Sequence, residues 1–132
     1  MTDIKRGYLD LHEHLEVLKQ QGLLLTIDRP VDKDAELHPL VRWQFVGGIE
    51  EHERKAFLFT NVVDGRGRKY AFPVVVGALA ANREIYCLGM RCTATEVQAR
   101  WDNAIANPIA PNIVTTAACQ EVVIEGDALR GE

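Results

Sequence analysis

The residues of this sequence with the greatest capacity for chemistry are four histidines, three cysteines and one glycine-rich basic segment. The triplet His12-Glu13-His14 resembles a metal-binding motif. On a helix, however, side chains two residues apart point roughly 200° apart, so the two imidazoles cannot bind one ion. The H-E-x-x-H spacing, which brings two histidines to one face, is absent. The triplet is therefore predicted to lie on a solvated helix face.

The other candidates for catalysis are His38, His52 and Cys92. A general base needs a positioned partner and a pocket, and the sequence shows neither for these histidines. Arg91 and a following helix start would favour the thiolate of Cys92, but no histidine or acid stands where it would complete a nucleophilic site. The sequence therefore predicts no catalytic, cofactor-binding or metal-binding residue. The roles of His38 and Cys92 stay open.

The cysteines Cys87, Cys92 and Cys119 indicate a reducing compartment. Their number is odd and no C-x-x-C pair occurs, which argues against a zinc site or a disulfide framework. We expect three reduced, mostly buried thiols. The amino-terminal segment Met1–Leu15 is charged and helical in pattern, with no apolar signal core. Because no apolar run is long enough to span a membrane either, we expect a cytoplasmic location.

The segment Gly65–Lys69 (GRGRK) is the one place that invites comparison with a phosphate-binding loop. A Walker loop ends in Gly-Lys-Ser/Thr and leads into a helix. Here the glycines lie between two apolar runs, Ala56–Val63 and Tyr70–Leu79, whose aromatic and β-branched residues predict strands. Asp64–Lys69 is therefore predicted to be a hairpin loop with a basic tip. By charge it is the best local candidate for binding an anion, and we interpret it as a surface loop for contacts.

Helix and strand signals alternate along the rest of the chain. Helices are predicted over residues 10–21, between the cap Asp34 and Gly47, over 83–88 after the cap Asn82, and from Thr93 to about 105. Strands are predicted over residues 23–27, 56–63, 70–79 and 119–125. Trp43 and Trp101 fall on apolar helix faces, so we expect them to be packing residues. Pro73–Gly77 has no polar side chain, so we expect both faces of that strand to be buried.

Length and composition fit one domain of ordinary size, with 132 residues of which 47% are apolar. The net charge of −4 argues against a nucleic-acid binder, and no polybasic segment indicates a membrane surface. The element order predicts an α/β (α+β) fold in which helices pack against a small mixed sheet. We assign residues 1–107 to this domain. Residues 108–132 are predicted to form a linker and a further strand.

The ordered set of segments resembles the first domain of UbiD-type decarboxylases, which are prenylated-FMN-dependent carboxy-lyases. The segments that resemble it are, in order, Leu15–Val31, Asp32–Leu37, Ala56–Val62, Phe72–Gly77, Asn82-Arg83, Leu88–Met90 and Ala118–Val123. The last of them resembles the segment by which that family enters its flavin-binding domain. The predicted C-terminal strand would accordingly extend toward a flavin-binding domain or a partner chain.

The resemblance also implies a cofactor and metals that lie outside this chain. Members of the family bind prenylated FMN, divalent manganese and potassium in a middle domain that also holds their catalytic Glu–Arg–Glu set. No position of this sequence matches those motifs, so no site residue is carried over. The segment Glu50–Lys55 and the loop Asp64–Lys69 are longer or more charged than the usual family pattern.

Two functions follow from these expectations. In the first, the chain is the N-terminal domain or a small subunit of a UbiD-like carboxy-lyase that acts on an aromatic or α,β-unsaturated carboxylic acid. A larger flavin-binding polypeptide, or the remainder of the same chain, would supply the chemistry within a homo-oligomeric assembly. In the second, it is a non-catalytic binding or assembly module that kept the fold. Whether the chain is itself part of an enzyme stays open at this point.

Overall fold

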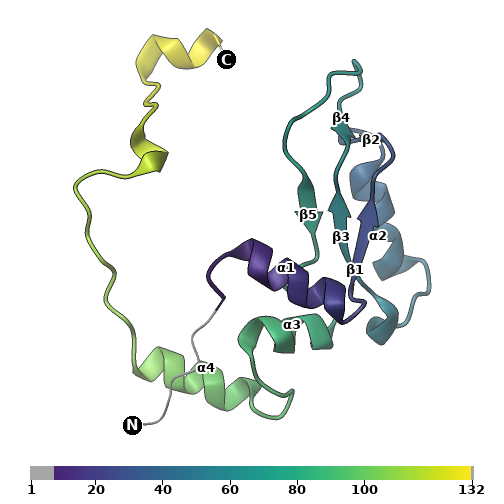
Figure 1. The fold of residues 1–132 in the computed structure, drawn as a ribbon, viewed down its shortest axis with the longest axis vertical. Coiled ribbons are helices and arrows are strands. Elements are labelled where there is room, and N and C mark those ends of the chain that lie inside the picture. Colours follow the sequence, from purple (N-terminus) through teal and green to yellow (C-terminus); the bar gives the residue numbers. More distant parts are fainter. Residues whose placement is uncertain (1–7, 132) are drawn as a thin grey trace.

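The structure, a computed structural model, describes residues 8–131 and has a small mixed sheet between helices (Figure 1). The helices and strands are α1 (Leu11–Gln20), β1 (Leu24–Ile27), β2 (Val31–Asp32), α2 (Leu37–Val46), β3 (Ala56–Phe59), β4 (Val62–Val63), β5 (Val74–Val76), α3 (Arg83–Met90) and α4 (Val97–Ala106). The 3-10 turns are η1 (Glu51–Glu53), η2 (Ala118–Gln120) and η3 (Gly126–Gly131). The predicted α/β (α+β) class is confirmed. The first seven residues of the predicted charged N-terminus lie outside the described part.

Local signals place the first and third helices as predicted. The Asp10 carboxylate accepts the Glu13 amide at 3.0 Å and caps α1, which ends before Gly22 in the left-handed region (φ +70°). In the same way the Asn82 side chain accepts the Ile85 amide at 2.7 Å and caps α3. The end of α3 was predicted at Gly89. The helix instead continues to Met90, and the left-handed residue is Arg91 (φ 52°).

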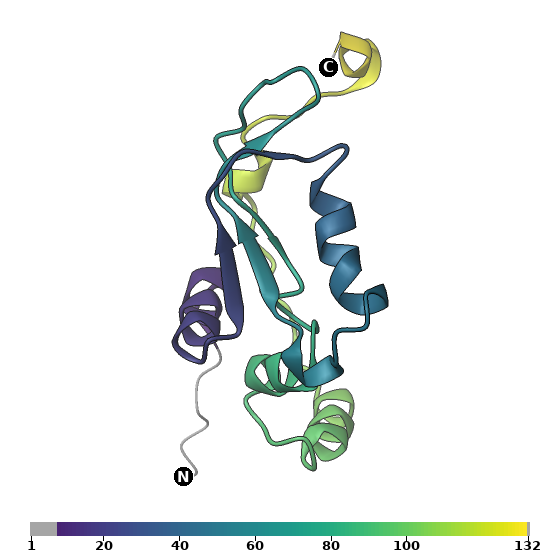
Figure 2. The same ribbon diagram turned by 90° about the vertical axis from the view of Figure 1, so that its right-hand side faces the viewer.

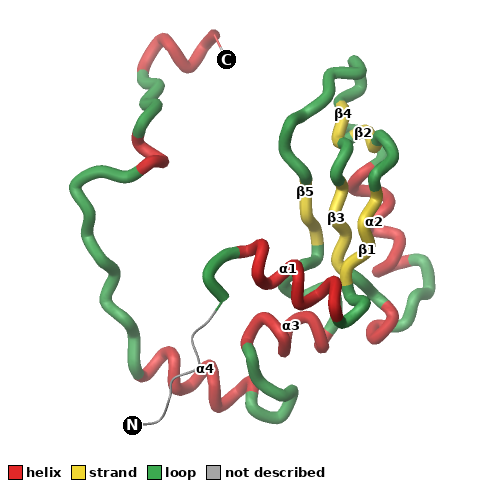
Figure 3. The backbone as a smooth tube through the Cα atoms, viewed as in Figure 1, coloured by secondary structure: helices red, strands yellow, loops and turns green. Residues whose placement is uncertain are grey.

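The sheet has the strand order β1-β3-β5. Strand β1 runs parallel to β3, and β5 pairs antiparallel with β3, so the predicted hairpin is confirmed. A short parallel pair, β2 and β4, continues beyond these strands and leads to the loop Asp64–Lys69 (Figure 3). The prediction that Pro73–Gly77 is buried on both faces was wrong. Strand β5 is half-buried because it lies at the edge of the sheet in the described chain.

Side chains alternate between two hydrophobic cores on opposite faces of the sheet. Helices α1 and α3 cover one face, and α2 covers the other (Figure 2). The first core is built on buried Leu18, Ala56 and Ile85, and the second on buried Val41 and Phe59. The strands predicted from apolar runs therefore serve as the scaffold between two helical layers.

Buried amide side chains hold the segment that leads into the central strand β3. Gln44 of α2, 4% exposed, receives the Lys55 amide at 2.9 Å and donates to the Lys55 carbonyl at 3.0 Å. From the opposite layer, Asn82 donates to the Arg54 carbonyl at 2.7 Å. The start of β3 is thus held from both sides by side chains that replace strand hydrogen bonds.

Asp34 does not cap the second helix as predicted. Helix α2 begins at Leu37, and its N-cap Glu36 makes no side-chain capping bond. The Asp34 carboxylate instead pairs with Lys33 and accepts the Gly65 amide at 3.4 Å. The Asp34 side chain is therefore bonded to the hairpin loop and not to the start of the helix.

The strand predicted over Cys119–Glu125 does not form. Residues 118–120 make the 3-10 turn η2, and residues 121–125 have no regular structure. Figure 1 shows this part of the chain running away from the sheet, so none of the described strands lies beside it to complete a ladder. None of the described helices is long and apolar enough to cross a membrane.

We predict that Gln44→Ala lowers the free energy of unfolding by about 2 kcal/mol, because it leaves the amide and carbonyl of Lys55 without their side-chain partner. Urea denaturation followed by circular dichroism measures the effect. Gln98→Ala, which removes an exposed side-chain bond to Asp102 on α4, is the matched control and should change stability by less than about 0.5 kcal/mol. Equal losses for the two variants would contradict the role assigned to Gln44.

Candidate functional site

The histidine triplet of α1 divides into one exposed and one buried ring. His12 is solvent-exposed, as predicted, with its side chain 92% accessible. His14 is buried, so the prediction of a solvated face was wrong for this residue. Its Nε2 lies 2.7 Å from the Ala78 carbonyl oxygen and therefore carries the proton, since a carbonyl can only accept. His14 thus ties α1 to the segment after β5, which is a structural role.

Of the remaining histidines and cysteines, His52 and Cys87 line one surface pocket, whereas His38 and Cys92 share no described pocket with a second candidate. His38 and His52 are exposed on the surface of α2 and η1. Cys87 and Cys92 are half-buried, whereas Cys119 is exposed, so the expectation of mostly buried thiols was wrong for Cys119. No group of three or more histidine, cysteine, aspartate or glutamate side chains within residues 8–131 has the geometry to hold a metal ion.

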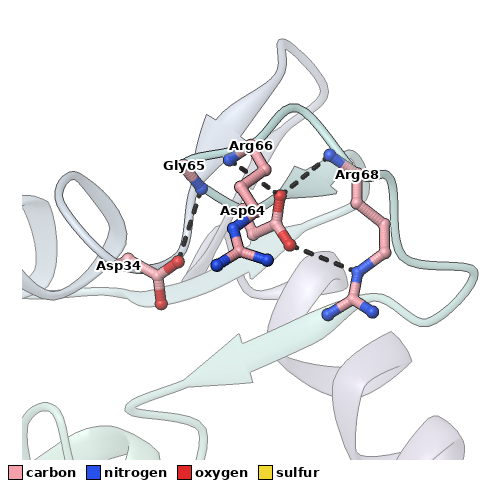
Figure 4. Close-up of a pocket in the computed structure, with 5 residues that line it drawn as sticks. All are labelled: Asp34, Asp64, Gly65, Arg66 and Arg68. Carbon is pink, nitrogen blue, oxygen red and sulfur yellow. Dashed lines mark hydrogen bonds and ion pairs between the residues drawn. The ribbon is translucent and has the colours of Figure 1, made fainter.

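The described pocket with the highest density of charge lies at the hairpin loop. It has a volume of about 430 Å³ and is lined by Asp34, Asp64, Gly65, Arg66 and Arg68 (Figure 4). Strands β2 and β4 run parallel, and the two aspartates follow the carboxyl ends of these strands. Ligand sites of open α/β sheets occur at this kind of position, outside the carboxyl ends of neighbouring parallel strands.

Asp64 organises this loop from within. Its side chain is only 10% accessible, and one carboxylate oxygen accepts the amides of Arg66 (3.0 Å) and Arg68 (2.8 Å). The other oxygen accepts the Arg68 guanidinium at 3.2 Å. The loop amides that would cradle a phosphate are therefore occupied by the protein's own carboxylate. This arrangement supports the interpretation of the segment as a contact loop.

The charges around the pocket are largely paired. The amide of Arg68 is the main cause that lowers the pKa of Asp64, and the Arg66 amide and Arg68 guanidinium act in the same direction. The hydrogen bond from the Lys33 ammonium lowers the pKa of the Asp34 carboxyl. The same hydrogen bond raises the pKa of Lys33. Both carboxylates are therefore ionised and hydrogen-bonded at neutral pH.

A second candidate surface is apolar and follows α4 into the C-terminal segment. Trp101 is 46% exposed and Ile105 73% exposed, and α4 has no buried residue. Ile109 and Ile113 lie in the irregular segment that follows the helix and are both 96% exposed. The prediction that Trp101 is a packing residue was wrong, because its side chain does not face a core in the described chain. Trp43 on α2, 64% exposed, is a further correction of the same kind.

Helix α4 is attached to α3 through Arg100, whose Nε donates to the Met90 carbonyl at 3.3 Å, and through Trp101. The Trp101 indole donates to the Tyr86 hydroxyl of α3 at 2.6 Å, which holds the ring at the surface. Exposed apolar residues scattered singly are ordinary, but several along one helix and the segment after it mark a candidate interaction surface. We refer to Val97, Trp101, Ile105, Ile109 and Ile113 as the α4 stripe.

Comparisons with known proteins identify one family and one similar structure. The family model of the 3-octaprenyl-4-hydroxybenzoate carboxy-lyase N-terminal domain (UbiD) matches residues 15–105. Vanillic acid decarboxylase from Sedimentibacter hydroxybenzoicus, solved in an open form with truncated ShVdcD, is similar in structure with a TM-score of 0.64 and 26% sequence identity. The match covers 92% of this chain and 26% of that decarboxylase chain, so this sequence spans about a quarter of its length.

The lowered pKa of Asp64 gives a prediction for the pH dependence of stability. A depressed folded-state pKa means that the unfolded chain binds more protons below about pH 4, so this contribution is present above that pH and is lost as pH falls through the folded-state value. We expect Asp64→Asn to be less stable than the parent at pH 7. The difference should shrink at pH 3, as measured by urea unfolding at both values. A difference that is unchanged or larger at pH 3 would contradict this role for Asp64.

Proposed function

Because the chain belongs to the UbiD carboxy-lyase family, whose N-terminal domain it contains, we propose that it is a structural, cleft-shaping part of a decarboxylase rather than its catalytic part. The proposed assembly acts on an aromatic or α,β-unsaturated carboxylic acid in the cytoplasm. The chain covers about a quarter of the similar vanillic acid decarboxylase chain, which supports a role as one part of a larger enzyme assembly. A larger polypeptide, or further residues of the same one, would supply the active site.

The donor set of the described residues does not fit the family's cofactor and metals. A divalent ion needs several converging oxygen or nitrogen ligands, and residues 8–131 offer no such group. The two arginines of the loop pocket lie beside Asp34 and Asp64, so a flavin phosphate there would face two ionised carboxylates. We therefore assign prenylated FMN, manganese and potassium to the larger polypeptide and derive no step of the reaction through residues of this chain.

The observation that supports this proposal most directly is the α4 stripe. Its apolar side chains are exposed along α4 and continue into the segment 108–131, which lies away from the sheet (Figure 1). Apolar area of this kind is stabilised by about 25 cal/mol for each Å² removed from water, so a partner surface that covers it gains binding energy. The predicted domain boundary near residue 107 would then separate the folded domain from a connecting segment that packs on the flavin-binding part.

The proposed function predicts that this chain associates with a larger flavin-binding polypeptide. When the chain is produced together with its genomic neighbours, we expect it to co-elute with a larger polypeptide and with visible flavin absorbance, since we assign the flavin to that polypeptide. Size-exclusion chromatography with a diode-array detector measures both. A colourless, monodisperse monomer under the same conditions would sink this proposal and favour the alternative of a stand-alone binding or assembly module.

The second prediction tests the α4 stripe. Ile105→Asp should weaken association with the larger polypeptide at least tenfold, about 1.4 kcal/mol, because it places a charge in a desolvated contact. Stability of the chain itself should change little, since Ile105 is 73% exposed. Asn103→Asp adds the same charge on α4 outside the stripe and is the control. Equal affinity of the two variants would show that the stripe is not the contact surface.

A further inference from the structure

The loop Asp64–Lys69 is more ordered than a surface hairpin requires. Besides the carboxylate bonds of Asp64, its backbone is closed by the Asp64 amide on the Arg68 carbonyl (3.0 Å) and the Gly67 amide on the Asp64 carbonyl (2.9 Å). The Arg68 guanidinium is held by Asp64 and donates to the Tyr70 hydroxyl at 2.7 Å. Binding sites benefit from such preorganisation because less conformational freedom is lost when the ligand arrives.

Arg66 and Lys69 are both cations of this loop without an ion pair among residues 8–131, and of the two it is Arg66 that lines the pocket. Within residues 8–131 its guanidinium makes no hydrogen bond or ion pair, although its backbone amide is bound to Asp64. Figure 4 shows the Arg66 side chain descending from the loop among the other pocket-lining residues. The loop 64–69 has three basic residues and one acidic residue, in a chain whose net charge is −4. The pocket therefore presents a free positive group within an acidic protein.

We propose that the pocket at the hairpin loop is a carboxylate-binding site in which the Arg66 guanidinium receives the ligand. A guanidinium presents a planar fork of N–H donors that matches the two oxygens of a carboxylate. Arg68 lines the same pocket and adds a second positive charge, fixed in position by Asp64 and Tyr70. The site lies in the contact loop and contains none of the residues of the α4 stripe.

The charge balance of the pocket favours a carboxylate over a phosphate. Asp34 and Asp64 line the pocket but are already paired with Lys33 and Arg68, so Arg66 is the one lining charge left to compensate. A second negative charge on the ligand would double its attraction to Arg66, whereas its desolvation cost would rise about fourfold. A single-charged, planar ligand therefore fits the pocket better than phosphate does. Such a group occurs on a free aromatic acid and on an acidic side chain of another protein, and both sources satisfy this chemistry.

The test is a titration of the isotopically labelled full chain followed by amide chemical shifts in NMR. Sodium benzoate stands for a free acid, N-acetylglutamate amide for an acidic side chain, and sodium phosphate and sodium chloride at equal ionic strength for other anions. We expect at least one carboxylate to shift the amides of residues 64–69 with a dissociation constant on the order of 1–10 mM, and to bind more tightly than phosphate. The tighter of the two carboxylates identifies the source.

Variants separate a built site from general charge attraction. Arg66→Gln should weaken carboxylate binding at least fivefold, whereas Arg42→Gln, which removes an exposed arginine of α2, should leave it unchanged. The proposal is overturned by equal shifts with chloride, by tighter binding of phosphate, by equal loss in the two variants, or by no shift up to about 50 mM. The titration uses this chain alone, so its failure would not contradict the proposed decarboxylase assembly. Failure of the chain to co-elute with a larger polypeptide would likewise not contradict carboxylate binding.

Discussion

The arrangement of this domain depends on how the chain enters its central strand. Strand β3 pairs with β1 on one side and β5 on the other, so an error in its position would displace the whole sheet. The two residues before it are held by Gln44 from the α2 layer and by Asn82 from the α3 layer. Both side chains are 4% exposed, and a buried amide is tolerated only when its partners are in place. One set of polar bonds therefore fixes the sheet and both helical layers relative to one another.

The same use of buried polar groups recurs where the chain turns. His14 attaches α1 to the carbonyl of Ala78, and Asp64 closes the hairpin loop through two backbone amides. In a catalytic domain, buried titratable groups of this type would be aimed at a substrate. Here His14 Nε2 and one oxygen of Asp64 are bonded to the protein's own backbone. These bonds hold the segments of the chain in position.

Much of the fold follows from signals that act over a few residues. The caps Asp10 and Asn82 and the glycine after α1 were readable, because their partners are three or four residues away in sequence. The burial of His14 was not, since its partner lies 64 residues along the chain. The exposure of the α4 stripe was not readable either, because an amphipathic pattern is identical whether its apolar face meets a core or another domain. The apparent strand at Cys119–Glu125 failed for a related reason: β-propensity has no effect without a neighbouring strand.

The two candidate surfaces differ in what they can contribute to an assembly. The α4 stripe lies at one end of the domain and the charged loop at the other, beyond the carboxyl ends of β2 and β4 (Figure 1). Apolar contact supplies affinity without direction, whereas an ionic contact at an arginine supplies orientation and discrimination but little net free energy at an exposed site. A domain held only by the stripe would be free to rotate about it. A second, charged contact at the far end would remove that freedom, so an apolar surface paired with a distant ionic one can hold a domain in a single orientation.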